Sequence, residues 1–219
     1  MYTYISNLLG LSHRLRTGRK YPKCTLTIHS TANPTSTPEQ ERKWLDNPEN
    51  TRDASWNFCV GERKVVCAIP EDEETWHCSV TEGNRHSISI EICESGNRAA
   101  VLQTAAEFTA EMLKKYGWGI DKLKRHYDWN KKNCPRILID KAYIKDNLNW
   151  NWFVKTVQEY LKPAEEIKPE MTKMLIDGKA TEVECVNVNG FYYAKLRDLV
   201  PKLGYNIGNS GRTPVIFKV

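Results

Sequence analysis

His126 and Cys134 are of two residue types that commonly bind zinc, and they lie eight positions apart. A catalytic zinc site usually takes three protein ligands and leaves a fourth position for water. The segment that holds both residues, RHYDWNKKNCP, looks irregular and is closed by Pro135. Neither an HExxH motif nor paired CxxC motifs occur, so no local motif identifies a metal. Spacing alone therefore leaves two interpretations open, a zinc site and a surface histidine near a buried thiol.

Two segments earlier in the chain alternate like strands, and each carries a reactive side chain on its polar side. Residues 24–30 (CTLTIHS) place His29 opposite the aliphatic face, and residues 87–94 (SISIEICE) do the same for Glu91. If both strands belong to one sheet, the imidazole and the carboxylate project into the same groove. Glu94 falls on the other face at the end of its strand, so Glu91 is the better candidate for chemistry.

The elements around these strands follow from periodicity and caps. Thr37 and Gln40 form a capping box, which predicts the start of a short helix. Residues 55–69 read as two β-segments around a turn. Apolar residues at helical spacing predict a long helix over 98–116 and a second over about 149–161. Such a set of elements can hold the strands that carry His29 and Glu91.

The pattern changes after a segment with two prolines and a charge cluster, PAEEIKPE. We interpret residues 162–170 as a linker between a domain of residues 1–161 and a small α+β domain of residues 171–219. Two turn signals, Asp177–Gly178 and Asn189–Gly190, a short helix and a last strand support the second domain. So small a domain is expected to dock or to self-associate, and self-association would give a homo-oligomer.

The net charge of +5 is concentrated in the N-terminal segment of residues 1–23. Five basic residues precede the first acidic residue, Glu39, and the remainder of the chain is balanced: Arg14, Arg16, Arg19, Lys20 and Lys23. This pattern favours an anionic polymer or surface as partner, with a solvated tail as the alternative. A nucleic-acid partner ranks last, because the charge is confined to some ten residues without interleaved aromatic side chains.

The beginning of the chain and its cysteines bear on the cellular compartment. The sequence MYTYISNLLGLSHRLR carries its charges after a short apolar patch and has no small-residue cleavage site, so we expect no secretory signal. No apolar run approaches the length that spans a membrane. Seven irregularly spaced cysteines without an export signal are expected to remain thiols, and no disulfide framework is predicted.

Four ordered blocks of the sequence resemble the type-2 N-acetylmuramoyl-L-alanine amidases. The blocks are TLTIHST, ASWNFCVGE with VCAIPEDEETWHCS, SISIEICE and RHYDWNKKNCP, and the likeness covers about residues 23–140. This family includes phage endolysins, bacterial autolysins and peptidoglycan-recognition proteins. The resemblance implies an α/β fold with a central mixed β-sheet flanked by helices. It also implies zinc-dependent cleavage of the peptidoglycan amide bond between N-acetylmuramic acid and L-alanine.

The resemblance also implies roles for five residues. His29, His126 and Cys134 match the metal ligands, which predicts one Zn²⁺ per chain. Glu91 matches the catalytic carboxylate, which would take a proton from water and pass it to the leaving amine. Lys132 matches the basic residue that stabilises the oxyanion.

Three further residues are expected to contact the substrate. Trp56 and Asn57 stand where some family members have a Tyr-His pair, and Trp56 cannot exchange a proton. His77, in TWHCS, matches a recurrent WH of the family and is expected to line the cleft, with packing in a loop as the alternative. Proton transfer is therefore expected to rest on Glu91.

The remaining expectations concern the tail and the biological role. The motifs IDGK and VNGFYYAKLRDLVPKLGY resemble, more weakly, stalk-type modules related to the N-terminal domain of copper amine oxidases. The tail contains no histidine, so we expect wall targeting or self-association rather than copper binding. An endolysin that waits in the host cytoplasm until release fits best, and an autolysin is also considered. The alternative function is a non-catalytic peptidoglycan-binding module, although such proteins typically lack the Cys or Asp ligand.

Overall fold

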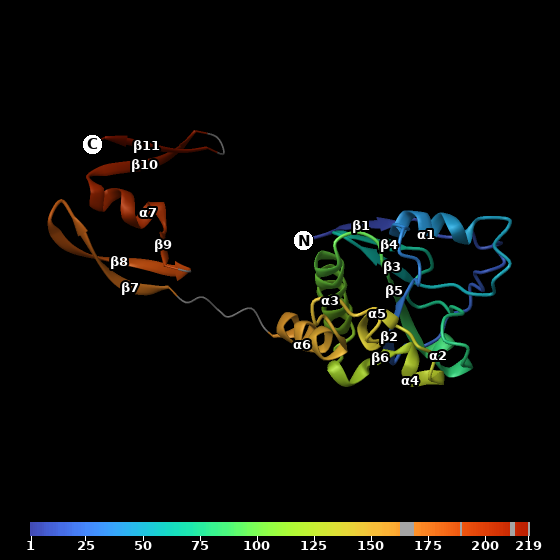
Figure 1. Cartoon of the computed structure of the whole chain (residues 1–219). Helices are drawn as coiled ribbons and strands as arrows, with labels where there is room; N and C mark the ends of the chain where they lie inside the picture. The colour runs from blue at the N-terminus through green and yellow to red at the C-terminus, as the bar shows by residue number, and fades with distance from the viewer. Residues whose placement is uncertain (163–168, 189, 211–212, 219) are drawn as a thin grey trace. The chain divides into compact units, whose positions relative to one another are not determined.

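The chain forms two compact units, Met1–Lys162 and Pro163–Val219 (Figure 1). The computed structural model describes residues 1–162, 169–188, 190–210 and 213–218. Most of the expected linker, residues 163–168, lies outside the described residues. Among the helices that are described, none is long and apolar enough to cross a membrane.

A six-stranded mixed sheet forms the centre of the first unit (Figure 1). Its strands lie in the order β1-β4-β3-β5-β2-β6. Strands β3 and β4 run antiparallel, and the other neighbouring pairs run parallel. The bounds are β1 (Thr3–Ser6), β2 (Thr25–Ser30), β3 (Phe58–Gly61), β4 (Lys64–Cys67), β5 (Ser87–Ile92) and β6 (Leu123–Arg125). The predicted α/β fold class with a central mixed sheet is confirmed.

The helices of this unit are α1 (Pro38–Leu45), α2 (Thr81–His86), α3 (Arg98–Lys115), α4 (His126–Asn130), α5 (Arg136–Ile139) and α6 (Trp150–Leu161), with a 3₁₀ turn η1 (Ile120–Lys122). The predicted capping box is present, because Gln40 N donates to Thr37 Oγ1 and Thr37 N donates to Gln40 Oε1. The expectation that the whole segment after Arg125 is irregular is wrong. Asp128 accepts hydrogen bonds from the backbone and guanidinium of Arg125, which stabilises the start of α4.

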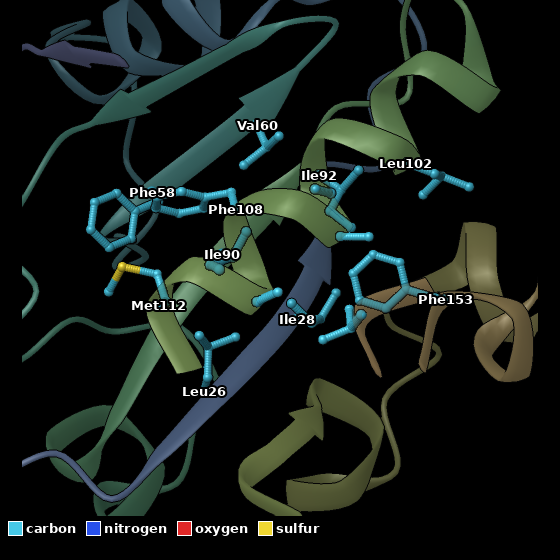
Figure 2. Close-up of a cluster of buried hydrophobic side chains, with 14 of the residues drawn as sticks. Leu26, Ile28, Phe58, Val60, Ile90, Ile92, Leu102, Phe108, Met112 and Phe153 are labelled. Atoms are coloured by element: carbon cyan, nitrogen blue, oxygen red, sulfur yellow. The ribbon is translucent and has the colours of Figure 1, made fainter. Parts of the chain in front are cut away.

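The main core lies between the sheet and α3 and α6 (Figure 2). Ile28 of β2 and Ile90 of β5 point toward Met112 of α3 and Phe153 of α6, and all four side chains are buried. The apolar positions of α3 recur at helical spacing, which is why the sequence predicted this helix. Burial of such side chains stabilises the fold by about 1.5–3 kcal/mol each. This core holds β2 and β5 side by side.

The opposite face of β2 and β5 is polar and also buried, which differs from the half-buried strand that the alternation predicted. Thr27, His29 and Ser89 are at most 1% exposed. Thr27 Oγ1 and Ser87 Oγ form a hydrogen bond of 2.7 Å, and Trp129 of α4 donates to Thr27 Oγ1 at 2.9 Å. Alternation in the sequence shows which face of a strand is polar but not whether that face is covered. Here a second layer of chain covers the polar face.

The N-terminal segment belongs to the folded unit, which corrects the alternative of a solvated tail. Strand β1 pairs with β4, and Leu9 and Leu15 are buried in a second apolar cluster with Trp56. Of its five basic side chains, Lys23 donates to backbone carbonyls. The other four have acidic partners at 2.6–3.0 Å: Arg14 with Asp53, Arg16 with Glu73, Arg19 with Glu74 and Lys20 with Asp72. Binding of anionic wall polymers stays a prediction, and these ion pairs leave less free charge for it.

The second unit has two small sheets. Its elements are β7 (Glu170–Ile176), β8 (Lys179–Val188), β9 (Phe191–Ala194), α7 (Leu196–Leu199), η2 (Val200–Leu203), β10 (Tyr205–Ser210) and β11 (Thr213–Lys218). Strands β7, β8 and β9 form one antiparallel sheet, and β10 and β11 form the other. The expected turn at Asp177–Gly178 joins β7 to β8, whereas Asn189 of the second expected turn lies outside the described residues.

Candidate metal centre

The parallel pairing of β2 and β5 brings the imidazole of His29 next to the carboxylate of Glu91. His29 and Glu91 are direct partners in the register of these strands. Their side chains leave the same face, with His29 Nδ1 at 4.0 Å from Glu91 Oε1. The juxtaposition expected from strand alternation is therefore present in the structure.

His126 reaches the same point because β6 pairs with the other side of β2. Arg125 at the end of β6 lies opposite Ile28, so His126 begins α4 beside His29. The two Nδ1 atoms are 3.0 Å apart. Two imidazole lone pairs at this separation repel each other unless a proton or a cation lies between them.

Cys134 completes the group through a reversal of the chain after α4. Lys131 adopts a left-handed backbone conformation (φ 65°) that ends the helix, and Tyr127 N then donates to Cys134 O at 2.9 Å. The Cys134 sulfur lies 3.7 Å from His29 Nδ1. One donor atom from each of His29, His126 and Cys134 lies within 4.8 Å of the others, and all three residues are buried.

The protonation chemistry of these donors fits a cation. Burial lowers the pKa of His29 well below its usual range and that of His126 to about 4, with Lys132 contributing to both shifts. Both imidazoles are therefore neutral, which is the form that binds metals. Burial raises the pKa of the Cys134 thiol to about 12, with the Glu91 charge as the next cause. A coordinated cation reverses this effect, because it stabilises the thiolate.

Glu91 has the properties of a general base beside this group. Burial raises its pKa to about 8, Glu41 and Glu94 add to the rise, and Lys132 opposes it. Its Oε2 atom is buried and has no hydrogen-bond partner in the part of the chain that the structure describes. A carboxylate with a raised pKa and a free oxygen in a cavity is a candidate for proton transfer.

Glu94 has a structural role. Its Oε2 accepts from the Arg136 guanidinium at 2.6 Å, and its Oε1 accepts from Ala32 N at 3.2 Å. Both oxygens are thus occupied, in contrast to those of Glu91. The preference for Glu91 over Glu94 that the strand register indicated agrees with this geometry.

A cavity of about 210 Å³ is lined by the side chains of His29, Glu91, His126 and Cys134. Lys132, whose side chain is exposed, lies on its wall together with Trp56 and Arg52. A wider groove of about 780 Å³ shares Arg52 and residues 31–32 with it and is also lined by Trp44 of α1. A substrate larger than the reacting bond can therefore continue from the cavity into the groove.

The three expected substrate contacts have different places in the structure. Trp56 lines the cavity. Asn57 is fully buried, and its Oδ1 accepts from Ser89 N at 2.9 Å and from Thr75 Oγ1 at 3.3 Å, so it supports the strands rather than facing a ligand. His77 touches the cavity, but both of its ring nitrogens are hydrogen-bonded within the protein.

Sequence reasoning missed two residues of this region. Arg52 lies where the cavity and the groove meet, and Trp44 lies farther along the groove. Neither residue stands in a motif, and the loop that holds Arg52 has no periodicity. Trp44 faces out from α1 at a position that a helical pattern assigns to the exposed side. No local signal in the sequence distinguished these two residues from ordinary surface side chains.

A buried His-His-Cys group beside a carboxylate, on the polar face of a mixed sheet, can hold a metal ion next to a group that can transfer protons. Comparison with protein families makes the assignment specific. Residues 20–137, more than half of the chain, match the family model described as N-acetylmuramoyl-L-alanine amidase (Amidase_2). The chain belongs to this family.

Relatives and solved structures agree with this membership. The chain is 38% identical over 128 residues to the N-acetylmuramoyl-L-alanine amidase CwlA of Bacillus subtilis (strain 168), covering 55% of this chain and 46% of CwlA. It is 36% identical over 138 residues to XlyB of the same strain, covering 57% of this chain and 43% of XlyB. It therefore spans about half the length of these relatives.

Two solved structures are similar to the first unit. The catalytic domain of XlyA superposes with a TM-score of 0.63 at 26% identity, covering 71% of this chain and 99% of that domain. A mutant endolysin from Bacillus subtilis gives a TM-score of 0.64 at 27% identity, covering 72% of this chain and 99% of the other. The family match ends at residue 137, so it does not include the second unit.

Proposed function

We propose that the protein hydrolyses the amide bond between N-acetylmuramic acid and L-alanine in peptidoglycan, with one zinc ion per chain. The observation that carries the proposal is the convergence of three buried donor atoms beside a carboxylate with a free oxygen. The names of the relatives support the choice of bond.

His29, His126 and Cys134 would hold the zinc ion, which supplies a Lewis acid and an acidified water molecule. Two neutral imidazoles and one thiolate leave this site a net charge of +1. Glu91 takes a proton from the attacking water at its free oxygen and passes it to the nitrogen of the leaving L-alanine. The products are the lactyl carboxylate of the sugar and the free amine of the peptide.

Lys132 and the cavity walls provide the remaining contributions. The Lys132 ammonium places a positive charge at the wall, where it can stabilise negative charge on the carbonyl oxygen in the transition state. Trp56 offers an apolar surface to the substrate and cannot exchange a proton. The groove past Arg52 and Trp44 gives room for the part of the substrate beyond the scissile bond.

The biological setting follows from the same family. A role as a phage endolysin or a bacterial autolysin that lyses cells by wall degradation is supported by the likeness to a Bacillus subtilis endolysin. An endolysin would remain in the host cytoplasm until release. For the second unit we propose wall targeting or self-association, in the manner of a stalk-type module. Sedimentation of the full chain decides between them, because a monomer at all concentrations contradicts self-association.

Digestion of purified cell walls tests the proposal. We expect mass spectrometry to find stem peptides with a free L-alanine amine and glycan strands with an intact lactyl group. Metal analysis should give one zinc per chain, a chelator should abolish peptide release, and added zinc should restore it. Cuts inside the stem peptide would contradict the amidase assignment. Binding to walls without any release would favour the non-catalytic module.

A further inference from the structure

The ring nitrogen of His29 that faces away from the metal ligands is hydrogen-bonded to a second histidine. His29 Nε2 lies 2.9 Å from His77 Nδ1, and His77 Nε2 lies 3.0 Å from the carbonyl oxygen of Gly83. All three groups are buried away from solvent. The chain of hydrogen bonds therefore starts at a backbone carbonyl and ends at a predicted zinc ligand.

The carbonyl at the start of this hydrogen-bonded chain determines which nitrogen donates in each hydrogen bond. A carbonyl oxygen can only accept, so His77 Nε2 must carry the proton that it donates to Gly83. In neutral His77 the other nitrogen, Nδ1, is then an acceptor, and it must receive the proton of His29 Nε2. His29 Nδ1 is left with its lone pair, and this is the atom that faces His126 and Cys134.

Neighbouring residues fix the position of His77. Asn84 Oδ1 accepts from the backbone amides of His77 and Cys78, both at 3.0 Å, which fixes the loop that carries the imidazole. A Cβ atom on Gly83 would collide with Cys78 Sγ and approach the Trp129 ring, so the close packing around the accepting carbonyl requires a residue without a side chain.

We propose that His77 is a positioning residue that selects the metal-binding tautomer of His29, not a substrate contact. The inference rests on the zinc site of the proposed function but concerns ligand orientation rather than the reaction. A ligand histidine whose second nitrogen is hydrogen-bonded is oriented and made more basic, and loss of such a partner typically lowers metal affinity about 10–100-fold.

The parent protein provides the first test. Long-range ¹⁵N–¹H NMR of the metal-free protein should show His29 and His77 both protonated at Nε2 and not at Nδ1. A His29 that carries its proton on Nδ1 would overturn the proposal, and this measurement needs no variant.

Zinc affinity of variants, measured by competition with a chromogenic chelator, provides the second test. We expect His77→Leu to bind zinc about 10–100-fold more weakly, and His77→Gln to recover part of the loss because an amide can both accept and donate. His86→Gln is the matched control, since His86 bonds to Pro22 O outside the site and should leave affinity unchanged. Circular dichroism confirms that each variant is folded.

The outcomes separate this inference from the proposed function. Equal zinc affinity of folded His77→Leu and the parent would refute the role of His77 and leave the amidase proposal standing. If the parent binds zinc but releases no stem peptide, the amidase proposal fails. In that case the affinity ratio still decides the role of His77.

Discussion

The two faces of the β2–β5 strand pair are both largely buried, yet one is a core and the other a candidate active site. The core face carries Leu26, Ile28 and Ile90 under α3 and α6. The other face carries His29 and Glu91. His29 is as deeply buried as these core side chains, whereas Glu91 is 19% exposed, so burial alone separates the two faces only weakly. The two faces differ in whether their buried groups have hydrogen-bond partners.

Polar groups on the second face fall into two kinds. Asn57, Ser89 and Thr75 satisfy one another through hydrogen bonds of 2.9–3.3 Å and act as a structural network. Glu91 has an oxygen without a hydrogen-bond partner among the described residues. His29 Nδ1 faces the ring nitrogen of His126 and the sulfur of Cys134, which could bind the same metal ion. A buried polar group without a partner is costly and needs an explanation, and for Glu91 the neighbouring group of donor atoms offers one.

Replacement of Glu91 is expected to have the largest effect and to separate activity from stability. Glu91→Gln removes the proton acceptor, so we expect kcat for wall hydrolysis to fall about 10²–10⁴-fold. Folding should not suffer, because burial already raises the pKa of this carboxyl to about 8 and disfavours its charge. Steady-state kinetics and thermal unfolding measure the two quantities.

Glu94→Gln is the matched control for this comparison. It replaces a part-buried ion pair with Arg136 by a weaker hydrogen bond, so stability should fall by about 1.5–3 kcal/mol while the activity per folded molecule is retained. If Glu91→Gln retained full activity, the assignment of the base would be wrong even though the family assignment would stand.

A substitution that creates a cavity on the core face should lower stability and leave activity unchanged. Ile90→Ala removes a fully buried side chain next to Phe58 and Phe108, and we expect the free energy of unfolding to fall by about 2–5 kcal/mol (Figure 2). Zinc affinity and activity should persist at temperatures where the variant is folded. Chemical denaturation and metal titration check this, and loss of zinc binding by the folded variant would show that the faces are not independent.

The sequence predicted the elements whose signals are local. The cap of α1, the spacing of α3 and the alternation of β5 each lie within a single segment, and the structure has all three. Glu91 could be chosen over Glu94 by register alone. The ligand set could not be derived in this way, because sheet order brings His126 beside His29 and the chain reversal after α4 brings in Cys134. That prediction came from the family resemblance.

The errors have a common physical cause, which is tertiary context. The alternative of a solvated N-terminal tail could be considered because the acidic partners of this segment, such as Glu73 and Asp72, lie some fifty residues away in sequence. Asn57 looked like a cleft residue, but a second layer covers it. Strand β1 gave no signal, because its side chains are mostly exposed and its pairing with β4 is non-local.

Lys132 offers the smallest and most selective test, through the pH dependence of kcat/KM. Glu91 must be deprotonated to act as a base, so activity rises as pH passes its pKa. The Lys132 charge lowers that pKa, whereas Glu41 and Glu94 raise it. Lys132→Gln should therefore move the acidic limb of the profile to higher pH, and Glu41→Gln should move it to lower pH.

Lys132→Arg keeps the charge and should leave the limb in place, which separates an electrostatic effect from a general loss of activity. The positive charge of a bound metal ion moves the acidic limb to lower pH in the parent and in every variant alike. The prediction therefore concerns the relative order of the midpoint pH values and not their absolute positions. An acidic limb that stays fixed across all three variants would mean that a group other than Glu91 controls the rate. Proton transfer would then not depend on Glu91, and the predicted metal ligands would be the remaining reactive groups of the polar face.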